Sequence, residues 1–355
     1  MSGMKRIKSW TLIAAAAVLA LCIAVALLSG KTVRAEDYAI KYDAAQRMQK
    51  CMDAVKHYKS ELGISLSEED WQETGMLGEE FTGITTTIGA LEAKRTSANP
   101  NMAAMLVQML GEAGVKRGDT VGAAFSGSFP SLNLATLAAC QSMGVNVVYI
   151  ASVGASMYGA NQPELTFPDM LLRMAKENLV PLPTALSLGG DWDCGMEMDP
   201  EEVEKLLPRL QSCGIPFLYE PDYEKNVALR MEIYQENGPI SCFIGVGGNV
   251  TTIGRGEDTM PCGVVQPYYR LTSSEKSGLL EIYSAKGLPV LHVLDVKELA
   301  MRYGFAYDPQ MPDPIGSGSI YERRSYPYAI CVFGIAAAVG LLAYGKYQKK
   351  REDAG

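Results

Sequence analysis

The sequence predicts an α/β protein: a doubly wound, mostly parallel sheet in an extracytoplasmic domain, plus two transmembrane helices. From about residue 100 onward, short apolar runs alternate with helical segments six times, which is typical of βα units. These strand-like runs are apolar throughout, as expected for parallel strands that are covered by helices on both faces. Two long apolar runs near the ends of the chain predict the membrane helices.

The first membrane helix is expected at residues 10–28, a run of 19 residues without a charge. Lys5, Arg6 and Lys8 precede it, so the positive-inside rule predicts that residues 1–9 are cytoplasmic and that the run is a signal anchor. The alternative is a cleavable signal peptide, with Val33 and Ala35 at the small-residue positions of a cleavage site. Either way, the residues that follow are expected outside the cytoplasm.

The second membrane helix is expected at residues 328–344, after a linker at 311–327. The tail that follows, residues 345–355, carries Lys346, Lys349, Lys350 and Arg351, and such a cationic block resists translocation. The chain is therefore predicted to be a two-pass cell-membrane protein in contact with the lipid bilayer. Both termini are expected in the cytoplasm and the central domain outside it.

Residues 36–99 are expected to form a helical stalk or docking region. Apolar side chains recur at spacings of three and four through residues 36–62, which predicts an amphipathic helix.

The α/β domain is predicted to cover residues 100–310. Thr166 and Asp169 form a capping-box pattern, and Asp199 followed by Pro200 supplies a cap and a proline at the first helical position. The remaining boundaries follow from periodicity and turn residues. Strands are expected at 120–125, 146–151, 184–188, 216–219, 241–247 and 289–294, and helices at 100–114, 131–143, 166–178, from 199 onward, and at 222–236, 273–286 and 296–303.

The charge balance of the central domain excludes some classes of partner. Without the membrane segments and their charged flanks, 25 Lys and Arg face 38 Asp and Glu, a net charge near −13. Such a surface repels nucleic acid and free polyanions, so no nucleic-acid partner is expected and an anionic ligand must be held locally. The chain has only two histidines, which argues against a zinc site and against a Ser-His-Asp triad. No metal and no cofactor are expected.

Six cysteines fall in the central domain, where oxidising conditions permit disulfides. Cys140 and Cys242 lie in apolar patterns typical of buried free thiols. Cys194, Cys213 and Cys262 lie nearer to loops and are candidates for a disulfide, but spacing does not fix a connectivity.

A ligand site is expected where the parallel strands end, because open α/β sheets bind ligands beyond the carboxyl ends of their strands. Small and polar residues follow four of the predicted strands there. A turn with backbone N–H groups at a helix N-terminus, as at residues 126–133, suits a carboxylate or phosphate. The candidate ligand-binding residues are Ser126, Gly127, Ser128, Ser152, Asp191, Asp193, Gly247, Gly248, Asn249 and Thr251.

Other interpretations of these loops are weaker or remain open. Turn and capping chemistry explains the serines without a ligand. Ser128 as a nucleophile lacks the G-x-S-x-G pattern. Residues 245–250 resemble a dinucleotide fingerprint, but a valine stands at the third glycine position. The acids from Asp191 onward imitate a calcium loop that fails at Gly195 and Met196. Residues 249–272 form a long connection that predicts a lid or a small insertion.

The basic N-terminal anchor, the stretch GDTVGAAFSGSFPSLNLATLAACQSMGVNVVYIASVGASMYGANQPELTFPDMLLRM at residues 118–174, and IGVGGNVTTIG at 244–254 carry a resemblance. In these features the chain resembles the bacterial poly-γ-glutamate system protein family. The resemblance implies an accessory component of a poly-γ-glutamate (capsule-type anionic polymer) biosynthesis and export system in the bacterial cell envelope. It implies the membrane components of the poly-γ-glutamate synthase as partners, and contact with the polymer itself. It implies no catalytic residue.

Three functions therefore compete. The first is the accessory component, which the resemblance and the two predicted anchors favour. The second is an extracytoplasmic hydrolase or transferase that acts on γ-glutamyl or cell-envelope polymers through Ser126, Asp191 and Asn249. The third is a non-catalytic domain that binds a small ligand, because the same crevice without a nucleophile binds and does not react. The scarcity of histidine disfavours an enzyme.

Overall fold

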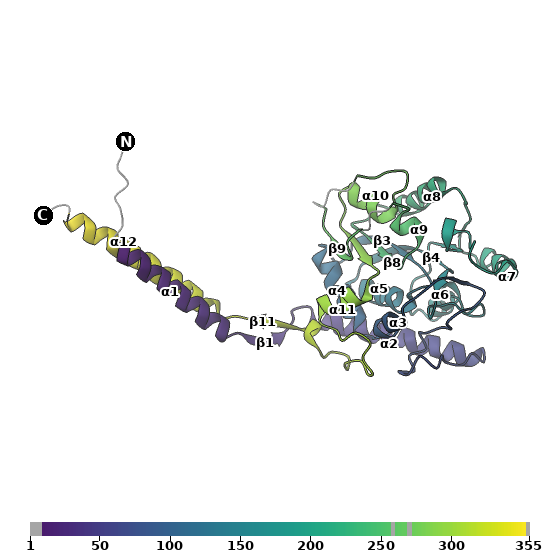
Figure 1. Cartoon of the computed structure of the whole chain (residues 1–355), viewed down its shortest axis with the longest axis horizontal. Coiled ribbons are helices and arrows are strands. Elements are labelled where there is room, and N and C mark those ends of the chain that lie inside the picture. Colours follow the sequence, from purple (N-terminus) through teal and green to yellow (C-terminus); the bar gives the residue numbers. More distant parts are fainter. Residues whose placement is uncertain (1–8, 257–259, 268–271, 353–355) are drawn as a thin grey trace. The chain divides into compact units, whose positions relative to one another are not determined.

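The computed structural model describes residues 9–256, 260–267 and 272–352. The chain forms two compact units, one from Met1–Ala35 and Glu322–Gly355, the other from Glu36–Tyr321 (Figure 1). Lys5, Arg6 and Lys8, on which the predicted orientation of the first helix depends, lie outside the described residues.

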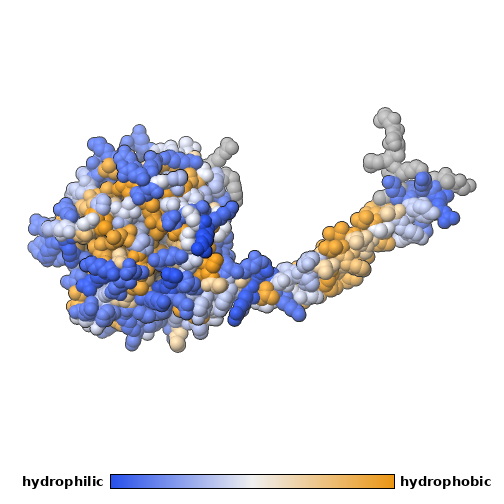
Figure 2. Space-filling model, turned by 180° about the vertical axis from the view of Figure 1, so that it is seen from behind, coloured by the Kyte–Doolittle hydropathy of each residue, from blue (hydrophilic) through white to orange (hydrophobic). Residues whose placement is uncertain are grey.

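The terminal unit pairs two long apolar helices, α1 (Ser9–Leu28) and α12 (Tyr328–Glu352), next to a two-stranded ribbon of β1 (Lys31–Arg34) and β11 (Glu322–Ser325). Both helices are long and apolar enough to cross a membrane, and Figure 2 shows the apolar side chains that cover their outer surface. Small residues bring them together: a Cβ added at Gly334 would lie 2.8 Å from Cys22 Cβ. Close contact through glycine is typical of helices that pair in membranes.

The larger unit is built on a seven-stranded sheet in the described part of the chain, with strand order β7-β6-β4-β3-β8-β10-β9. Only β9 runs antiparallel to its neighbour in that sheet, so the predicted α/β class with a mostly parallel sheet is confirmed. The strands are β3 (Thr120–Phe125), β4 (Asn146–Ser152), β6 (Ala185–Ser187), β7 (Phe217–Leu218), β8 (Cys242–Val246), β9 (Gly263–Val265) and β10 (Val290–Val293).

Helices cover both faces of this sheet. Successive residues of each strand point to opposite faces, so one strand contributes side chains to an apolar cluster on each side. Val121, Ala123 and Phe125 of β3 join one apolar cluster with α4 (Met102–Glu112), α5 (Pro130–Met143) and α6 (Phe167–Lys176). Ala124 joins a second cluster with α8 (Tyr223–Glu236) and α10 (Leu279–Ala285). Figure 1 shows α8 and α10 on one side of the sheet and α4 and α5 on the other. Strands buried on both sides explain the uninterrupted apolar runs of the sequence.

The predicted helix caps form as expected. Thr166 and Asp169 make a reciprocal capping box at the start of α6, and the side chain of Asp199 accepts from the Glu201 N–H at the start of α7 (Pro200–Gln211). The last helix of the domain, α11 (Val296–Tyr303), is capped by Asp295. These bonds satisfy N–H groups that have no partner inside the helix.

The structure adds detail to three segments of the sequence-based prediction. The amphipathic helix α2 (Tyr38–Glu61) packs on α4 and α5 and belongs to the same compact unit as the sheet. The long connection at 249–272 contains the short helix α9 (Val250–Ile253) and the edge strand β9. The helix expected at 273–286 begins only at Leu279.

Three further short elements lie over the sheet edge where the site forms. Strand β2 (Thr85–Thr87) pairs in parallel with β5 (Ala155–Ser156), and helix α3 (Leu91–Ser97) follows β2 after the short link 88–90. This small sheet places the start of α3 beside the loop that follows β4.

Candidate functional site

A cavity of about 660 Å³ opens at the carboxyl ends of the parallel strands. Strand β3 lies between β4 and β8, so the chain leaves the sheet in opposite directions on the two sides of β3. Such a switch point is where doubly wound sheets form their ligand crevice. The cavity wall combines the loops after β3, β4, β6, β8 and β10 with the segment from β2 to α3. Its volume is in the range of small-molecule sites, about 300–1,000 Å³.

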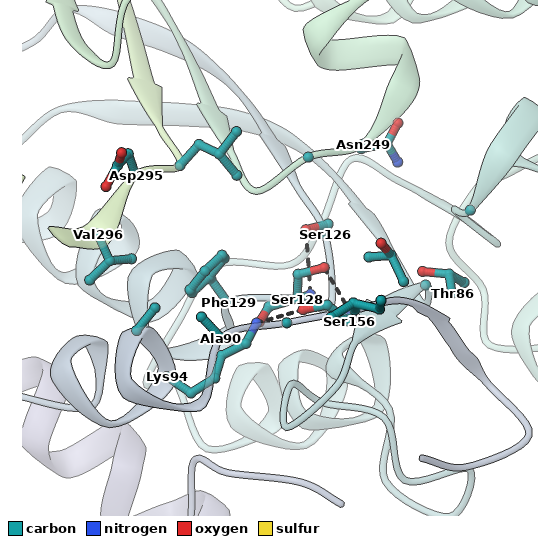
Figure 3. Close-up of a pocket in the computed structure, with 18 of the residues that line it drawn as sticks. Thr86, Ala90, Lys94, Ser126, Ser128, Phe129, Ser156, Asn249, Asp295 and Val296 are labelled. Carbon is teal, nitrogen blue, oxygen red and sulfur yellow. Dashed lines mark hydrogen bonds between the residues drawn. The ribbon is translucent and has the colours of Figure 1, made fainter. Parts of the chain in front are cut away.

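Half of the predicted ligand-binding residues line this cavity. Ser126 and Ser128 follow β3, Asp191 lies in the loop after β6, and Gly248 and Asn249 follow β8. Figure 3 shows Ser126, Ser128 and Asn249 at the cavity. The loops that follow β3, β6 and β8 therefore contribute to one rim.

The other predicted residues lie behind the cavity wall. The Ser152 hydroxyl donates to the Phe125 carbonyl at 3.2 Å, and the Thr251 hydroxyl donates to Asn249 Oδ1 at 2.7 Å. Gly127 and Gly247 permit close backbone approach: an added Cβ would lie 2.4 Å from the Val153 carbonyl at Gly127, and 2.1 Å from Ser126 Oγ at Gly247. Gly247 also has φ +84°, where glycine is favoured. These residues shape the wall and do not contact the cavity.

Asp193 also lies behind the wall, in a buried polar network. Its carboxylate pairs with the Arg230 guanidinium and accepts from the Ser187 hydroxyl at 2.9 Å. Asn226 and Asn249 donate to the same carboxylate at 3.3 and 3.4 Å. Both charged side chains are almost completely buried. Asp193 therefore holds the loop after β6 and orients Asn249, whose other side faces the cavity.

Lys94 is a cavity residue that the sequence did not single out. It reaches from α3 and donates to the Ser128 carbonyl, and its Nζ lies 2.6 Å from Ser156 Oγ (Figure 3). Nζ also lies 3.7 Å from the centre of the Phe129 ring. The side chain is only 2% exposed. In the described residues, no carboxylate lies within salt-bridge distance of Lys94.

Burial without an acidic partner lowers the pKa of Lys94 to about 7, because the protonated amine loses its hydration and gains no counter-charge. A lysine with such a pKa is a mixture of neutral amine and ammonium at neutral pH. It can donate to an anionic ligand, and in its neutral form it can accept a proton.

Ser128 and Ser156 are held against each other by the backbone. The Ser156 N–H donates to Ser128 Oγ at 3.0 Å, which leaves the Ser128 hydroxyl proton available for another acceptor. Asn133 Nδ2 donates to the Ser126 carbonyl at 2.8 Å and fixes the turn that enters α5. Ser128 and the N-cap residue Phe129 line the cavity, so the positive end of the α5 dipole faces the same space.

Charged residues of both signs border the outer part of the cavity. Asp191, Glu197 and Asp295 are acidic and Lys297 is basic. Glu197 accepts from the Asp191 N–H at 2.9 Å, and Asp295 caps α11. The cavity is therefore suited to a ligand with both cationic and anionic groups, rather than to a long polyanion.

The described residues that line the cavity include no histidine and no cysteine. His292 is buried on β10 away from the cavity, with Nδ1 3.0 Å from the Met260 carbonyl. All eight cysteines fall in the described ranges and are free thiols, so none of Cys194, Cys213 and Cys262 is in a disulfide. Among residues 9–256, 260–267 and 272–352, no group of three or more His, Cys, Asp or Glu is placed to hold a metal.

Comparison with protein-family models, with curated proteins and with solved structures finds no match for this chain.

Proposed function

We propose that this protein is a membrane-tethered accessory component of a poly-γ-glutamate system, and that its α/β domain binds a short γ-linked glutamyl segment in the cavity between β3 and β8. The observation that carries the binding role is the convergence of Lys94, the Ser126–Ser128 turn and the start of α5 on one ligand-sized cavity. The polymer context is supported by the resemblance of residues 118–174 and 244–254 to that family.

The cavity suits a glutamyl unit for reasons of charge and size. Lys94 and the N-terminal end of α5 favour a carboxylate, and the acids on the rim favour the free ammonium group at the amino end of a short segment and repel a longer polyanion. A cavity of about 660 Å³ holds a short segment and not an extended chain. Because the domain is acidic as a whole, contact with the polymer is expected to stay local.

The proposal includes an orientation: both termini in the cytoplasm and the domain outside, in contact with the membrane components of the synthase. It is supported by the basic residues before the first apolar helix and after the second. A phosphatase fused near residue 200 should be active, and a cytoplasmic reporter fused after Gly355 should be functional. Cytoplasmic behaviour of the fusion near residue 200 would refute the orientation.

Binding is tested by filling the cavity. Gly248 has no neighbour within 3.8 Å of an added Cβ and no positive φ, so Gly248→Leu places a side chain in the cavity without backbone strain. We expect this change to weaken binding of γ-linked oligoglutamate to the full chain in detergent micelles by about 10-fold or more, measured by titration calorimetry. Gly111→Leu, on the exposed side of α4, is the matched control and should bind as wild type.

The cellular role is tested with the same pair of variants. Deleting the gene should lower the amount of surface polymer or alter its release, while ligase activity in cell extracts stays intact. Complementation with Gly111→Leu should restore the polymer and complementation with Gly248→Leu should not. Unchanged polymer yield, length and attachment in the deletion strain would contradict the proposed function.

A further inference from the structure

Among the described residues of the domain three lysines are buried, and they are held differently. Lys41 lies 3.1 Å from Asp37 Oδ2, so its charge is paired. Lys59 donates to the Leu77 carbonyl at 2.6 Å; burial lowers its pKa to about 8, and the nearby carboxylates of Asp70 and Glu79 oppose that shift only in part. Lys94 contacts a carbonyl, a serine hydroxyl and an aromatic ring, and it is the one that lines the cavity. Lys41 is paired with an acid and Lys59 has acids nearby, whereas burial is the one cause of the lowered pKa of Lys94.

The partner of Lys94 is a hydroxyl at the cavity surface. Ser156 lines the cavity, and the β2–β5 ladder fixes it by placing Thr87 opposite Ser156. An added Cβ at Gly89 would lie 2.9 Å from Ser156 Oγ, so the chain between β2 and α3 closes over one side of the pair. A serine hydroxyl within hydrogen-bond distance of a buried base is the arrangement that nucleophilic catalysis requires.

We infer that Ser156 and Lys94 form a nucleophile–base pair that cleaves the γ-amide bond of a bound glutamyl segment through an acyl-serine intermediate. The identity of the acyl group rests on the proposed function; the pair itself rests on the geometry of the cavity. An enzymatic role would then depend on Ser156 and Lys94, and not on Ser126, Asp191 and Asn249.

The first half of the reaction forms the acyl-serine. Ser156 Oγ attacks the amide carbonyl carbon and forms a C–O bond, the carbonyl π electrons move to oxygen, and the hydroxyl proton passes to neutral Lys94 Nζ. The carbonyl then re-forms, the C–N bond breaks, and its electron pair leaves with nitrogen, which takes the proton from Lys94. The products are a free amine and an ester on Ser156.

The second half releases the acyl group. Water attacks the ester while Lys94 accepts its proton, the bond to Ser156 Oγ breaks, and Lys94 returns the proton to that oxygen. The net change is amide plus water to carboxylic acid plus amine, with no change of oxidation state. The Ser128 hydroxyl, which already accepts from the Ser156 N–H, has its proton free to stabilise the oxygen that becomes negative.

The test uses the full chain in detergent micelles and a fluorescent fluorophosphonate, which forms a stable adduct with activated serines. We expect a single adduct on Ser156, located by peptide mass spectrometry of the wild-type protein. Ser156→Ala should abolish labelling, and Lys94→Met should slow it by about 100-fold or more, which is the range of a general base. The matched controls are Ser284→Ala, a buried serine on α10, and Lys59→Met, and both should label at the wild-type rate.

The outcomes separate this inference from the proposed function. No adduct, or an adduct at another residue of the wild-type protein, overturns the nucleophile–base pair even if γ-linked oligoglutamate still binds. An adduct on Ser156 that γ-linked oligoglutamate slows supports the inference and the ligand together. An adduct on Ser156 that this ligand leaves unaffected supports the pair and overturns the γ-glutamyl assignment. Because the wild-type adduct is mapped directly, a variant that fails to fold does not decide the result.

Discussion

Replacing Arg230 with methionine is expected to lower the free energy of unfolding of the domain by about 3–5 kcal/mol, because it leaves the Asp193 carboxylate buried without a counter-charge. Arg230 also donates to Ser187 Oγ and to Asn226 Oδ1, each at 2.9 Å, so three polar groups lose a partner at once. The loss is measured by urea unfolding of the full chain in detergent micelles, followed by circular dichroism.

The control is an ion pair of similar chemistry at the surface. Arg173 lies 3.2 Å from Glu61, and both side chains are at least a third exposed. Solvent screening limits such a pair to about 1 kcal/mol or less, so Arg173→Met should be nearly neutral. The double variant Arg230→Met with Asp193→Asn removes both buried charges and should recover part of the lost stability. A stability of Arg230→Met within about 1 kcal/mol of wild type would contradict the role assigned to the network.

The sequence predicts most of the sheet because its signals are local. Apolar runs on both faces, helix caps such as Thr166 with Asp169, and turn residues between them fix element type and order. The edge strand β9 was missed because it is three residues long and lies in a connection rich in polar residues and glycine. The late start of α10 has a local cause: the residues before Leu279 include three serines and Gly278, which favour turns and caps, and Gly278 is the N-cap.

The candidate site likewise combines residues that the sequence could predict with residues that it could not. Ser126, Ser128, Gly248 and Asn249 could be predicted because carboxyl ends of parallel strands converge wherever the sheet is parallel. Asp193 could not be assigned to the wall, because its partner Arg230 lies 37 residues further along the chain. Lys94 could not be found either, since a lysine between Ala93 and Arg95 in a short helix has the pattern of an exposed residue. Only tertiary packing makes it buried and unpaired.

Burial of Lys94 makes the free energy of unfolding depend on pH, and this dependence can be measured without knowing a ligand. Its pKa is about 7 in the folded protein, and an unfolded lysine titrates near 10.4. Below pH 7 both states carry the proton, so stability does not change with pH through this group. Between about pH 7 and 10 the unfolded state binds more protons than the folded state, so stability rises with pH. The slope from this one lysine is at most about 1.4 kcal/mol per pH unit.

Lys94→Met removes that slope. We expect the unfolding free energy of wild type, measured in urea from pH 6 to 9, to rise relative to that of Lys94→Met once the pH exceeds about 7. The variant also loses the bonds to Ser128 and Ser156, but that loss is independent of pH and only offsets the two curves. Lys59→Met is the matched control: the pKa of Lys59 is lowered only to about 8, so its curve should depart from wild type one pH unit later. Parallel curves for wild type and Lys94→Met from pH 6 to 9 would show that Lys94 stays protonated, and would leave Ser156 without a base at neutral pH.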